Sequence, residues 1–565
     1  MTRLVQLCLS LVGLLLVGLG VPGLLAGCGL TGEHIPSVDN VCADDSDCGA
    51  AACDPEASRC VSPPASPMRL TLEVVPASDP EHRVRVGAVI PDVEVGAGAS
   101  TRDLVVPFAV PLVGTVRWMG MPVAAELTFD RQSEIPSARA MAQSTSTFPL
   151  VEPAAPREQD FAIELAPNAR YTLTVTPRDE FATQLPPLRA VLEVGATGQR
   201  VPIEYPEELA PGIELHGDVA DLAGEPQVNL SVRAVEIASG RTVSSVALTS
   251  EDGNFRIVVD RGASAWVLRI TPTPERQLAE PTPSFDVDPA VLYPDELGWA
   301  HVLVPTAQRA VMFAGTVEYP RDGSARPVAG ALMRLRSTDV VDRTTGIVGS
   351  YETTLTVDGE GRYSGHVLPG TYDVHITPTT DVELGVLAQQ IAITRGTLGQ
   401  VFHMPLRTVV SGWVQAPDGT RVMGARVRAR ALGWQLPGRS DAIAPLARST
   451  ESVTAEMGAF RLPLDVGVYD MVIEPPEGSG FPWQVQRALG IGGSDTPLVR
   501  GGIELRYPVI VRGAVRWEDD APLAGEVRAW AFVRDPETDA ERALEIGRAS
   551  IAADGTYELV VPPTL

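Results

Sequence analysis

The chain has 565 residues, which is room for roughly four to six domains of ~100 residues each. Its 71 acidic residues outnumber its 45 basic ones, and the net charge near −26 disfavours nucleic acid and anionic lipid headgroups as partners. Every basic residue is arginine, which excludes a Schiff-base lysine, a phosphate-loop lysine and a lysine–asparagine crosslink. The 52 glycines and 49 prolines, with only 5% aromatic residues, favour short strands joined by turns over long helices.

The chain begins with an apolar run over residues 4–27, behind the single charge of Arg3. Such a run predicts a signal peptide or a membrane-spanning helix. Its last residues and the cysteine that follows, LAGC ending at Cys28, resemble the lipobox of bacterial lipoproteins. The resemblance implies cleavage before Cys28 and lipidation of this cysteine, and two or more acyl chains give stable anchoring. The alternative is an uncleaved helix over 4–27, which Pro22 and the glycines of the run disfavour.

Four further cysteines cluster after Cys28, at Cys42, Cys48, Cys53 and Cys60. In an exported chain this cluster predicts two disulfides, and three connectivities are possible. The segment is too small to hold a hydrophobic core, so the crosslinks would have to stabilise it.

The first loop of the cysteine cluster is acidic, with Asp44, Asp45 and Asp47. These carboxylates could offer ligands to Ca²⁺, but the loop lacks the glycine and the final glutamate of an EF-hand. We favour a solvated acidic loop. Zinc is disfavoured because export oxidises thiols and no histidine lies in register, so we predict no metal and no cofactor. Residues 62–68 read as a short stiff spacer.

Three landmarks then recur about every hundred residues. A glycine within an alternating apolar strand stands at Gly114, Gly217, Gly315, Gly412 and Gly513. An aromatic residue follows each of them, at Phe161, Phe255, Tyr363, Phe460 and Tyr557. A further aromatic residue stands six residues before a proline, at Tyr171, Trp266, Tyr372 and Tyr469. A period of this length predicts a tandem array of domains.

Alternation of apolar and polar residues with period two, together with Asp-Gly turns, predicts antiparallel β-sandwiches. The order of the landmarks resembles the carboxypeptidase regulatory-like domain, which is related in shape to transthyretin-like and collagen-adhesin B-type modules. The third repeat matches best, with Asp358-Gly359, Tyr363, Pro369-Gly370, Tyr372 and Pro378. The resemblance covers nearly all of 109–565 and implies a general-purpose β module without fixing a function.

We therefore predict an all-β fold, a tandem array of antiparallel β-sandwiches after a small disulfide-rich N-terminal segment. The expected domains are a lipoprotein signal peptide over 1–27, a lipidated disulfide-rich segment with its linker over 28–67, a partial or atypical β unit over 68–108, β-sandwiches over 109–206, 207–306, 307–407 and 408–507, and a truncated β-sandwich over 508–565.

One strand does not fit this plan. The last repeat lacks its aromatic-to-proline strand, while residues 70–76 look like a separate copy of that strand. We expect 70–76 to form a half-domain with 85–108, or to pack on the Gly114 domain. Pairing with the final repeat would contradict this hypothesis, and pairing between chains would make head-to-tail filaments.

The sequence shows no signature of catalysis. It has no GxSxG elbow, no HExxH pattern and no phosphate-binding glycine loop, and the zinc peptidase domain that accompanies the family resembled above is absent. His375 lies within a strand on the face opposite Val374 and Ile376, so we expect it to be exposed. We predict that the protein is not an enzyme and has no catalytic residue.

Two groups of aromatic residues bear on binding. Trp118, Tyr319 and Trp517 share strand parity with core valines, so we expect them on the core face. Trp434 and Trp483 lie in insertions of the fourth repeat, and loops carry recognition on β-sandwiches. These two tryptophans are the better candidates for contact with a ligand.

The sequence thus predicts a non-catalytic, lipid-anchored protein at the outer membrane of a Gram-negative-type bacterium, acting as a surface scaffold, adhesion or interaction module. The alternative is a carbohydrate-binding accessory lipoprotein that uses its loop tryptophans. A role as partner or regulator of a peptidase rests only on the name of the family resembled. Expected partners are the membrane, through the N-terminal lipid, and an envelope protein or polysaccharide, but no nucleic acid.

Overall fold

The structure is a computed structural model of the full chain. It describes residues 40–48, 51–62, 68–77, 87–95, 100–136, 143–147, 160–205, 213–260, 263, 265–289, 299–304, 309–321, 323–337, 348–379, 383–395, 397–433, 448–492, 498–534 and 541–564. The predictions for the signal peptide, for Cys28 and for Trp434 lie outside the described residues.

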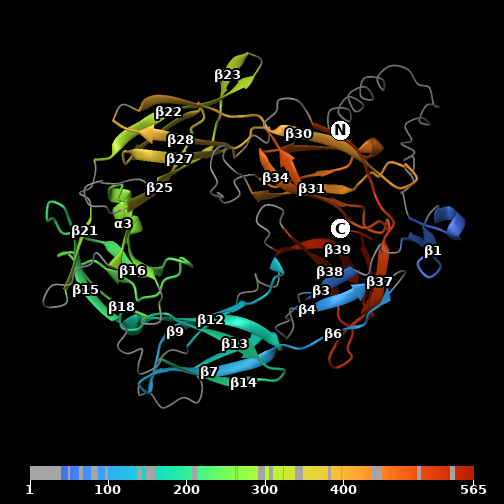
Figure 1. The fold of residues 1–565 in the computed structure, drawn as a ribbon, viewed down its shortest axis with the longest axis horizontal. Helices are drawn as coiled ribbons and strands as arrows, with labels where there is room; N and C mark the ends of the chain where they lie inside the picture. Colours follow the sequence, from blue (N-terminus) through green and yellow to red (C-terminus); the bar gives the residue numbers. More distant parts are fainter. Residues whose placement is uncertain are drawn as a thin grey trace, which may run out of the picture. The chain divides into compact units, whose positions relative to one another are not determined.

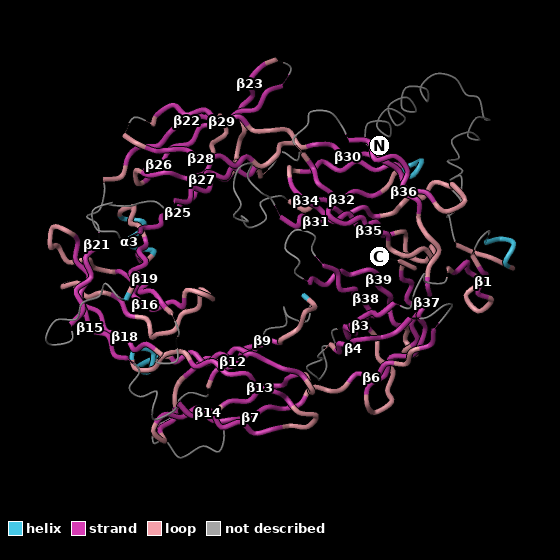
Figure 2. The backbone as a smooth tube through the Cα atoms, in the orientation of Figure 1, coloured by secondary structure: helices cyan, strands magenta, loops and turns pink. Residues whose placement is uncertain are grey.

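The predicted all-β fold class is confirmed: strands run through the whole described chain, and helix occurs only in short pieces (Figure 2). The described helical pieces are the α-helix α3 (Pro274–Ala279) and the 3₁₀ turns η1 (Asp45–Cys48), η2 (Asp179–Thr183) and η4 (Glu456–Gly458). At the start of α3, the side chain of Thr273 accepts a hydrogen bond from the backbone N–H of Arg276, and Pro274 fills a first-turn position. None of the helices in the described part of the chain is long and apolar enough to span a membrane.

The first and second sandwiches, residues 110–205 and 213–304, share one topology (Figure 1). The first contains β7 (Val110–Trp118), β8 (Met121–Pro122), β9 (Ala125–Arg131), β10 (Gln143–Ser146), β11 (Phe161–Leu165), β12 (Ala169–Pro177), β13 (Leu188–Val194) and β14 (Gln199–Tyr205). The second contains β15 (Ile213–Asp221), β16 (Leu230–Glu236), β17 (Ala247–Leu248), β18 (Asn254–Val259), β19 (Trp266–Pro272), β20 (Ser284–Val287) and β21 (Trp299–Val304). In each, a sheet ordered β10-β9-β12-β13 or β17-β16-β19-β20 faces a sheet ordered β11-β7-β14 or β18-β15-β21.

The third and fourth sandwiches, residues 311–404 and 408–504, repeat this arrangement. The third contains β22 (Val311–Arg321), β23 (Ser324–Pro327), β24 (Leu332–Ser337), β25 (Val348–Thr356), β26 (Arg362–Val367), β27 (Gly370–Thr377), β28 (Leu387–Ile393) and β29 (Leu398–His403). The fourth contains β30 (Thr408–Gln415), β31 (Arg426–Gly433), β32 (Thr450–Val453), β33 (Ala459–Leu464), β34 (Gly467–Glu474), β35 (Gln484–Ile491) and β36 (Leu498–Glu504). Their larger sheets have the orders β25-β24-β27-β28 and β32-β31-β34-β35.

The fifth sandwich is built from both ends of the described chain. Its strands are β3 (Met68–Pro76), β4 (Ala88–Val95), β5 (Ser100–Thr101), β6 (Leu104–Val106), β37 (Val509–Trp517), β38 (Gly525–Arg534), β39 (Glu541–Ile551) and β40 (Thr556–Val561). One sheet has the order β39-β38-β3-β4, and Figure 1 draws the blue strands β3 and β4 beside the red β38 and β39. In the other, β5 and β6 pair in parallel with β37.

The hypothesis for strand 70–76 is therefore wrong in its main point. The strand does pair with β4, as a unit with 85–108 requires, but its other edge pairs with β38 of the last repeat from Thr71↔Trp530 to Pro76↔Gly525. The physical reason is burial: Leu70, Leu72 and Val74 complete one core with Val511, Val515 and other residues of the final repeat. Segments 68–108 and 508–565, predicted as a partial and a truncated unit, share a single sandwich.

The spacing of the repeat glycine and the next aromatic residue is explained by strand register. In every sandwich the aromatic residue lies opposite the glycine across an antiparallel pair, as in Tyr363↔Gly315. A Cβ atom at Gly315 would lie 1.9 Å from the carbonyl oxygen of Gln400 on the parallel strand and 2.7 Å from the tyrosine hydroxyl. Only glycine leaves room there for both the ring and the third strand, an arrangement known as aromatic rescue.

The aromatic residue six positions before each proline is also a folding device. Tyr171, Tyr372 and Tyr469 are buried, and each hydroxyl bonds the backbone four or five residues upstream. The Tyr372 hydroxyl donates to the carbonyl of Leu368 at 2.7 Å, which is the geometry of a tyrosine corner. Burial raises the pKa of all three tyrosines, so the hydroxyls stay protonated hydrogen-bonding groups.

Neighbouring sandwiches are joined by different contacts. Strand β20 of the second pairs with β25 of the third, so their larger sheets form one eight-stranded sheet. Between the third and fourth, Asp465 accepts hydrogen bonds from Arg407 at 3.1 and 3.0 Å, from Arg448, and from the backbone N–H of Val386. Arg448 also donates to the carbonyl of Pro378, which ties both sandwiches to the same carboxylate.

Candidate functional site

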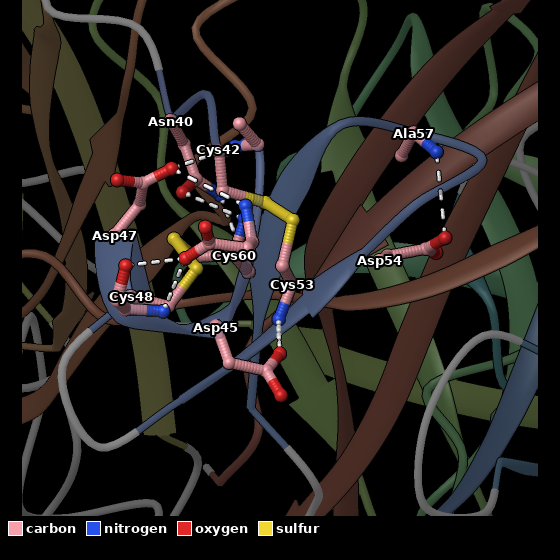
Figure 3. Close-up of a disulfide and its surroundings, with 12 residues drawn as sticks. Asn40, Cys42, Asp45, Asp47, Cys48, Cys53, Asp54, Ala57 and Cys60 are labelled. Carbon is pink, nitrogen blue, oxygen red and sulfur yellow. Dashed lines mark hydrogen bonds between the residues drawn. A yellow bond between two sulfur atoms is a disulfide. The ribbon is translucent and has the colours of Figure 1, made fainter.

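The cysteine cluster forms a compact unit, called the knot below, that precedes the first long strand, β3, in the sequence. It consists of η1, β1 (Ala52–Asp54) and β2 (Arg59–Val61), where β1 and β2 form an antiparallel pair. Cys42 bonds Cys53 and Cys48 bonds Cys60, with Cα–Cα distances of 5.9 and 5.3 Å (Figure 3). The two predicted disulfides are confirmed, and the structure selects one of the three connectivities.

The acidic residues of the knot accept hydrogen bonds from its own backbone. Asp47 accepts hydrogen bonds from the N–H groups of Ala43 and Asp44, and Asp45 accepts one from Cys53 at 2.7 Å (Figure 3). Hydrogen bonds from Ser46 lower the pKa of Asp44. Within the described ranges, the cluster of potential metal ligands is Cys42, Cys48 and Cys53, and all three sulfurs are in disulfides.

The knot is fixed to the fourth and fifth sandwiches by polar contacts. The buried Asn40 donates from its backbone to Ser479 at 2.8 Å and from its side chain to the Gly480 carbonyl at 3.2 Å. Arg59 pairs with Glu558 of the fifth sandwich. In the opposite direction, Arg512 of the fifth sandwich reaches Asp54 of the knot at 2.9 Å.

Beside these contacts lies a cleft with a volume of about 1320 Å³. Three parts of the chain line it: Arg59 of the knot, Arg426 and the loop after Glu474 in the fourth sandwich, and strands of the fifth sandwich that carry Arg512 and Arg548. This volume exceeds the roughly 300–1,000 Å³ of pockets that hold drug-sized ligands, so the cleft has room for part of a longer ligand.

Trp483, one of the two predicted contact residues, lines this cleft. It follows β34 in a loop rich in proline and glycine, in which Phe481 is buried and anchors the turn. The Trp483 indole is half-buried, with the Arg428 guanidinium 5.9 Å from the ring centroid. Such a cation–π contact restricts the orientation of the indole.

Charges in the cleft are largely neutralised by neighbours. Arg512 contacts Asp54, Glu56 and Glu558 at 2.9–3.0 Å. Burial lowers the pKa of this guanidinium, but hydrogen bonds to Glu558 and Asp54 outweigh burial and raise it. Arg548 lies 2.8 Å from Glu545. The lining holds four arginines and five carboxylates, so it offers hydrogen-bond donors and acceptors with nearly balanced charge.

The aromatic residues assigned to the core face are confirmed. Trp517 is buried and stacks on Phe108, with ring centroids 5.2 Å apart. Trp118 is half-buried and meets Phe181 edge-on, and Tyr319 packs at the margin of the third core.

The expectation that His375 is exposed is wrong, because only 8% of the residue is accessible. It stands on the outer face of β27, a central strand, opposite Arg334 on β24 and Ala388 on β28. Burial is the main cause of its lowered pKa, which favours the neutral imidazole. A central strand has a neighbouring strand on each side, and strand parity alone does not register the cover that these neighbours provide.

Most cleft residues could not be found by sequence reasoning. Arg59, Arg426, Arg512 and Arg548 come from distant parts of the chain, and no local motif links them. The one usable signal was the Trp-bearing insertion after Glu474, because it interrupts the repeat.

No protein-family model and no curated protein sequence matches this chain. Solved structures with similarity include a streptococcal ancillary pilin, at 13% identity and a TM-score of 0.23, covering 53% of this chain and 99% of the pilin. They also include GBS52, the minor pilin of Streptococcus agalactiae, at 12% identity and a TM-score of 0.22, covering 35% of this chain and 96% of the pilin. BcpA, the major pilin subunit of Bacillus cereus, matches at 10% identity and a TM-score of 0.13, covering 52% and 99%. Similarity at this level does not indicate what the chain binds.

Proposed function

We propose that the protein is a non-catalytic, lipid-anchored component of the cell envelope that acts as a surface scaffold or adhesion module. The observation that carries this proposal is that the repeated residues close the core of each sandwich. The glycines and aromatic residues of the repeat recur because each sandwich needs them to close its own core, whereas contacts between sandwiches, such as the β20–β25 strand pairing and the Arg407–Asp465 ion pair, use residues outside these repeated positions. The repeated residues therefore build the modules of an array, an organisation that gives repeat proteins extended binding surfaces.

The location is part of the proposal. The LAGC sequence that ends at Cys28 supports lipidation, and the disulfides of the knot suit an oxidising compartment outside the cytoplasm. We place the anchor at the outer membrane of a Gram-negative-type bacterium, and we assign the sandwiches to the carboxypeptidase regulatory-like type on the order of their landmarks.

The test is mass analysis of the mature N-terminus, in the wild type and in Cys28→Ala. The expected result is an acylated N-terminal cysteine in the wild type and release of the Cys28→Ala variant from the membrane fraction. An unmodified Cys28 in the wild type would remove the anchor and the location. Crosslinking in intact cells should then capture a defined envelope partner if the protein is a scaffold, and hydrolysis of peptides by the pure protein would contradict a non-catalytic role.

A second candidate function, carbohydrate binding through loop tryptophans, is favoured by one observation: Trp483 lies half-buried in the cleft of about 1320 Å³. Trp434 lies outside the described residues and adds nothing to this argument.

A further inference from the structure

The cleft between the knot and the last two sandwiches combines three properties that bear on its ligand. It has about 1320 Å³ of space, it presents a half-buried indole, and four arginines and five carboxylates line it. A cleft of this size that joins an aromatic face to polar groups is suited to a hydroxyl-rich chain longer than a single small molecule.

The polar groups that a ligand could reach are identifiable from their exposure. Arg426 keeps 53% of its side chain exposed, Arg548 37% and Glu526 38%. The guanidinium groups donate hydrogen bonds, and the carboxylate accepts them. A hydroxyl group does both, so it can bond to either kind of group without displacing a counter-charge.

Charge compensation disfavours a strongly ionic ligand. Each of the four lining arginines has an acidic partner. The pairs are Arg59 with Glu558, Arg426 with Glu474, Arg512 with Asp54 and Arg548 with Glu545. An acidic polymer would have to compete with these carboxylates, and a cationic one with the arginines. A neutral ligand meets neither cost.

We propose that this cleft binds a segment of an uncharged polysaccharide, with Trp483 stacking on a sugar ring and Arg426, Arg548 and Glu526 bonding its hydroxyl groups. The inference rests on the second candidate function and adds to it a site, a ligand class and the polar residues. The cleft lies between the knot and the fourth and fifth sandwiches. Binding therefore depends on residues that are distant in the sequence and come together only in the folded chain.

The test measures binding of neutral hexasaccharides (maltohexaose, cellohexaose and chitohexaose) to the full chain purified in detergent, by titration calorimetry. The variants are Trp483→Ala, Trp483→Phe and Arg426→Gln. The matched control is Trp413→Ala, a half-buried tryptophan of the same sandwich that stacks with Arg421 and does not line the cleft. Hexagalacturonate serves as the charged comparator.

We expect at least one neutral hexasaccharide to bind, with an affinity that changes little with salt. Trp483→Ala should weaken it about tenfold or more, Arg426→Gln by a few-fold, and Trp483→Phe less than the alanine variant, while Trp413→Ala leaves it unchanged. Three results would each overturn the inference: no binding of any neutral hexasaccharide, binding that both Trp483→Ala and Arg426→Gln leave intact, or tighter and salt-sensitive binding of hexagalacturonate. Acylation of Cys28 is measured on the same preparation, so failure here is separable from failure of the envelope proposal.

Discussion

Replacing Asp465 by asparagine should loosen the join between the third and fourth sandwiches. The Asp465 carboxylate is 3% exposed and accepts hydrogen bonds from Arg407, whose side chain is 5% exposed, and from Arg448. Asparagine keeps the size of the side chain but removes its charge and one acceptor. The buried Arg407 would then lose its ion pair with this carboxylate.

The magnitude follows from two independent arguments. Burial of the Asp465 carboxylate raises its pKa, but the hydrogen bonds from Arg407 and Arg448 outweigh burial and lower the pKa from 3.8 to about 2. That difference corresponds to about 2 kcal/mol of stability in the ionised state. Breaking a buried ion pair by removing one partner typically costs ~3–5 kcal/mol. We therefore expect Asp465→Asn to cost about 3 kcal/mol.

The same numbers set the pH dependence. Because the folded-state pKa of Asp465 is depressed, its contribution is fully present above the unfolded value of 3.8 and is lost as pH falls toward 2. The wild type should lose this stability in that window. The variant should lack this part of the pH dependence.

The assay must be local, because a chain of several sandwiches does not unfold in a single two-state step. Hydrogen exchange read by mass spectrometry gives opening free energies for peptides covering 383–407 and 459–474. We expect exchange about a hundredfold faster there in Asp465→Asn. The control is Asp358→Asn in an exposed turn of the third sandwich, where the carboxylate accepts hydrogen bonds from the backbone N–H groups of Glu360 and Arg362. Equal effects of the two variants, or unchanged exchange in Asp465→Asn, would refute the assignment of this carboxylate as a joining group.

Three further predictions concern the fold. Gly315→Ala should destabilise the third sandwich by about 3 kcal/mol or prevent its folding, whereas Gly359→Ala, with no atom near the added Cβ, should be close to neutral in thermal denaturation. Leu72→Ala should cost ~2–5 kcal/mol and raise hydrogen exchange in β37–β40, over 400 residues downstream. Arg69→Ala, at an exposed position on the same strand, should leave this exchange unchanged. Unchanged exchange in the C-terminal strands of Leu72→Ala would show that β3 is not part of their sheet. Each of the two disulfides closes a short loop and should contribute roughly 3 kcal/mol of stability. Their reduction should therefore make the knot sensitive to trypsin cleavage after Arg59. Resistance to trypsin both before and after reduction would contradict this prediction.

The repeat itself was readable from sequence because its causes are local to each module. The glycine at Gly315 and the tyrosine at Tyr363 face each other across two paired strands, and the same steric demand recurs in every sandwich. A requirement that each module must meet to close its own core appears as a periodic pattern. The disulfide-bearing segment was readable for a similar reason, since four cysteines in a chain with a predicted export signal have few alternatives.

The partner of strand 70–76 was not readable. Its sequence matches the strand missing from the last repeat, but apolar alternation does not specify which sheet a strand joins. Burial in the core selected the partner: Leu70, Leu72 and Val74 pack against residues more than 400 positions away in the sequence. The burial of His375 has the same origin, because cover by neighbouring strands is a property of the sheet and not of its own strand.

The sequence by itself determined the all-β class, the hundred-residue module, the disulfide-bearing segment and Trp483 as a candidate for contact with a ligand. Only the tertiary structure decided which strands complete the fifth sandwich and which side chains meet Trp483 in the cleft. The physical reason is the range of the interactions. Strand alternation, turns and glycine–aromatic pairs act within one module and repeat along the chain, whereas Arg59, Arg426 and Arg548 become neighbours only when separate modules pack.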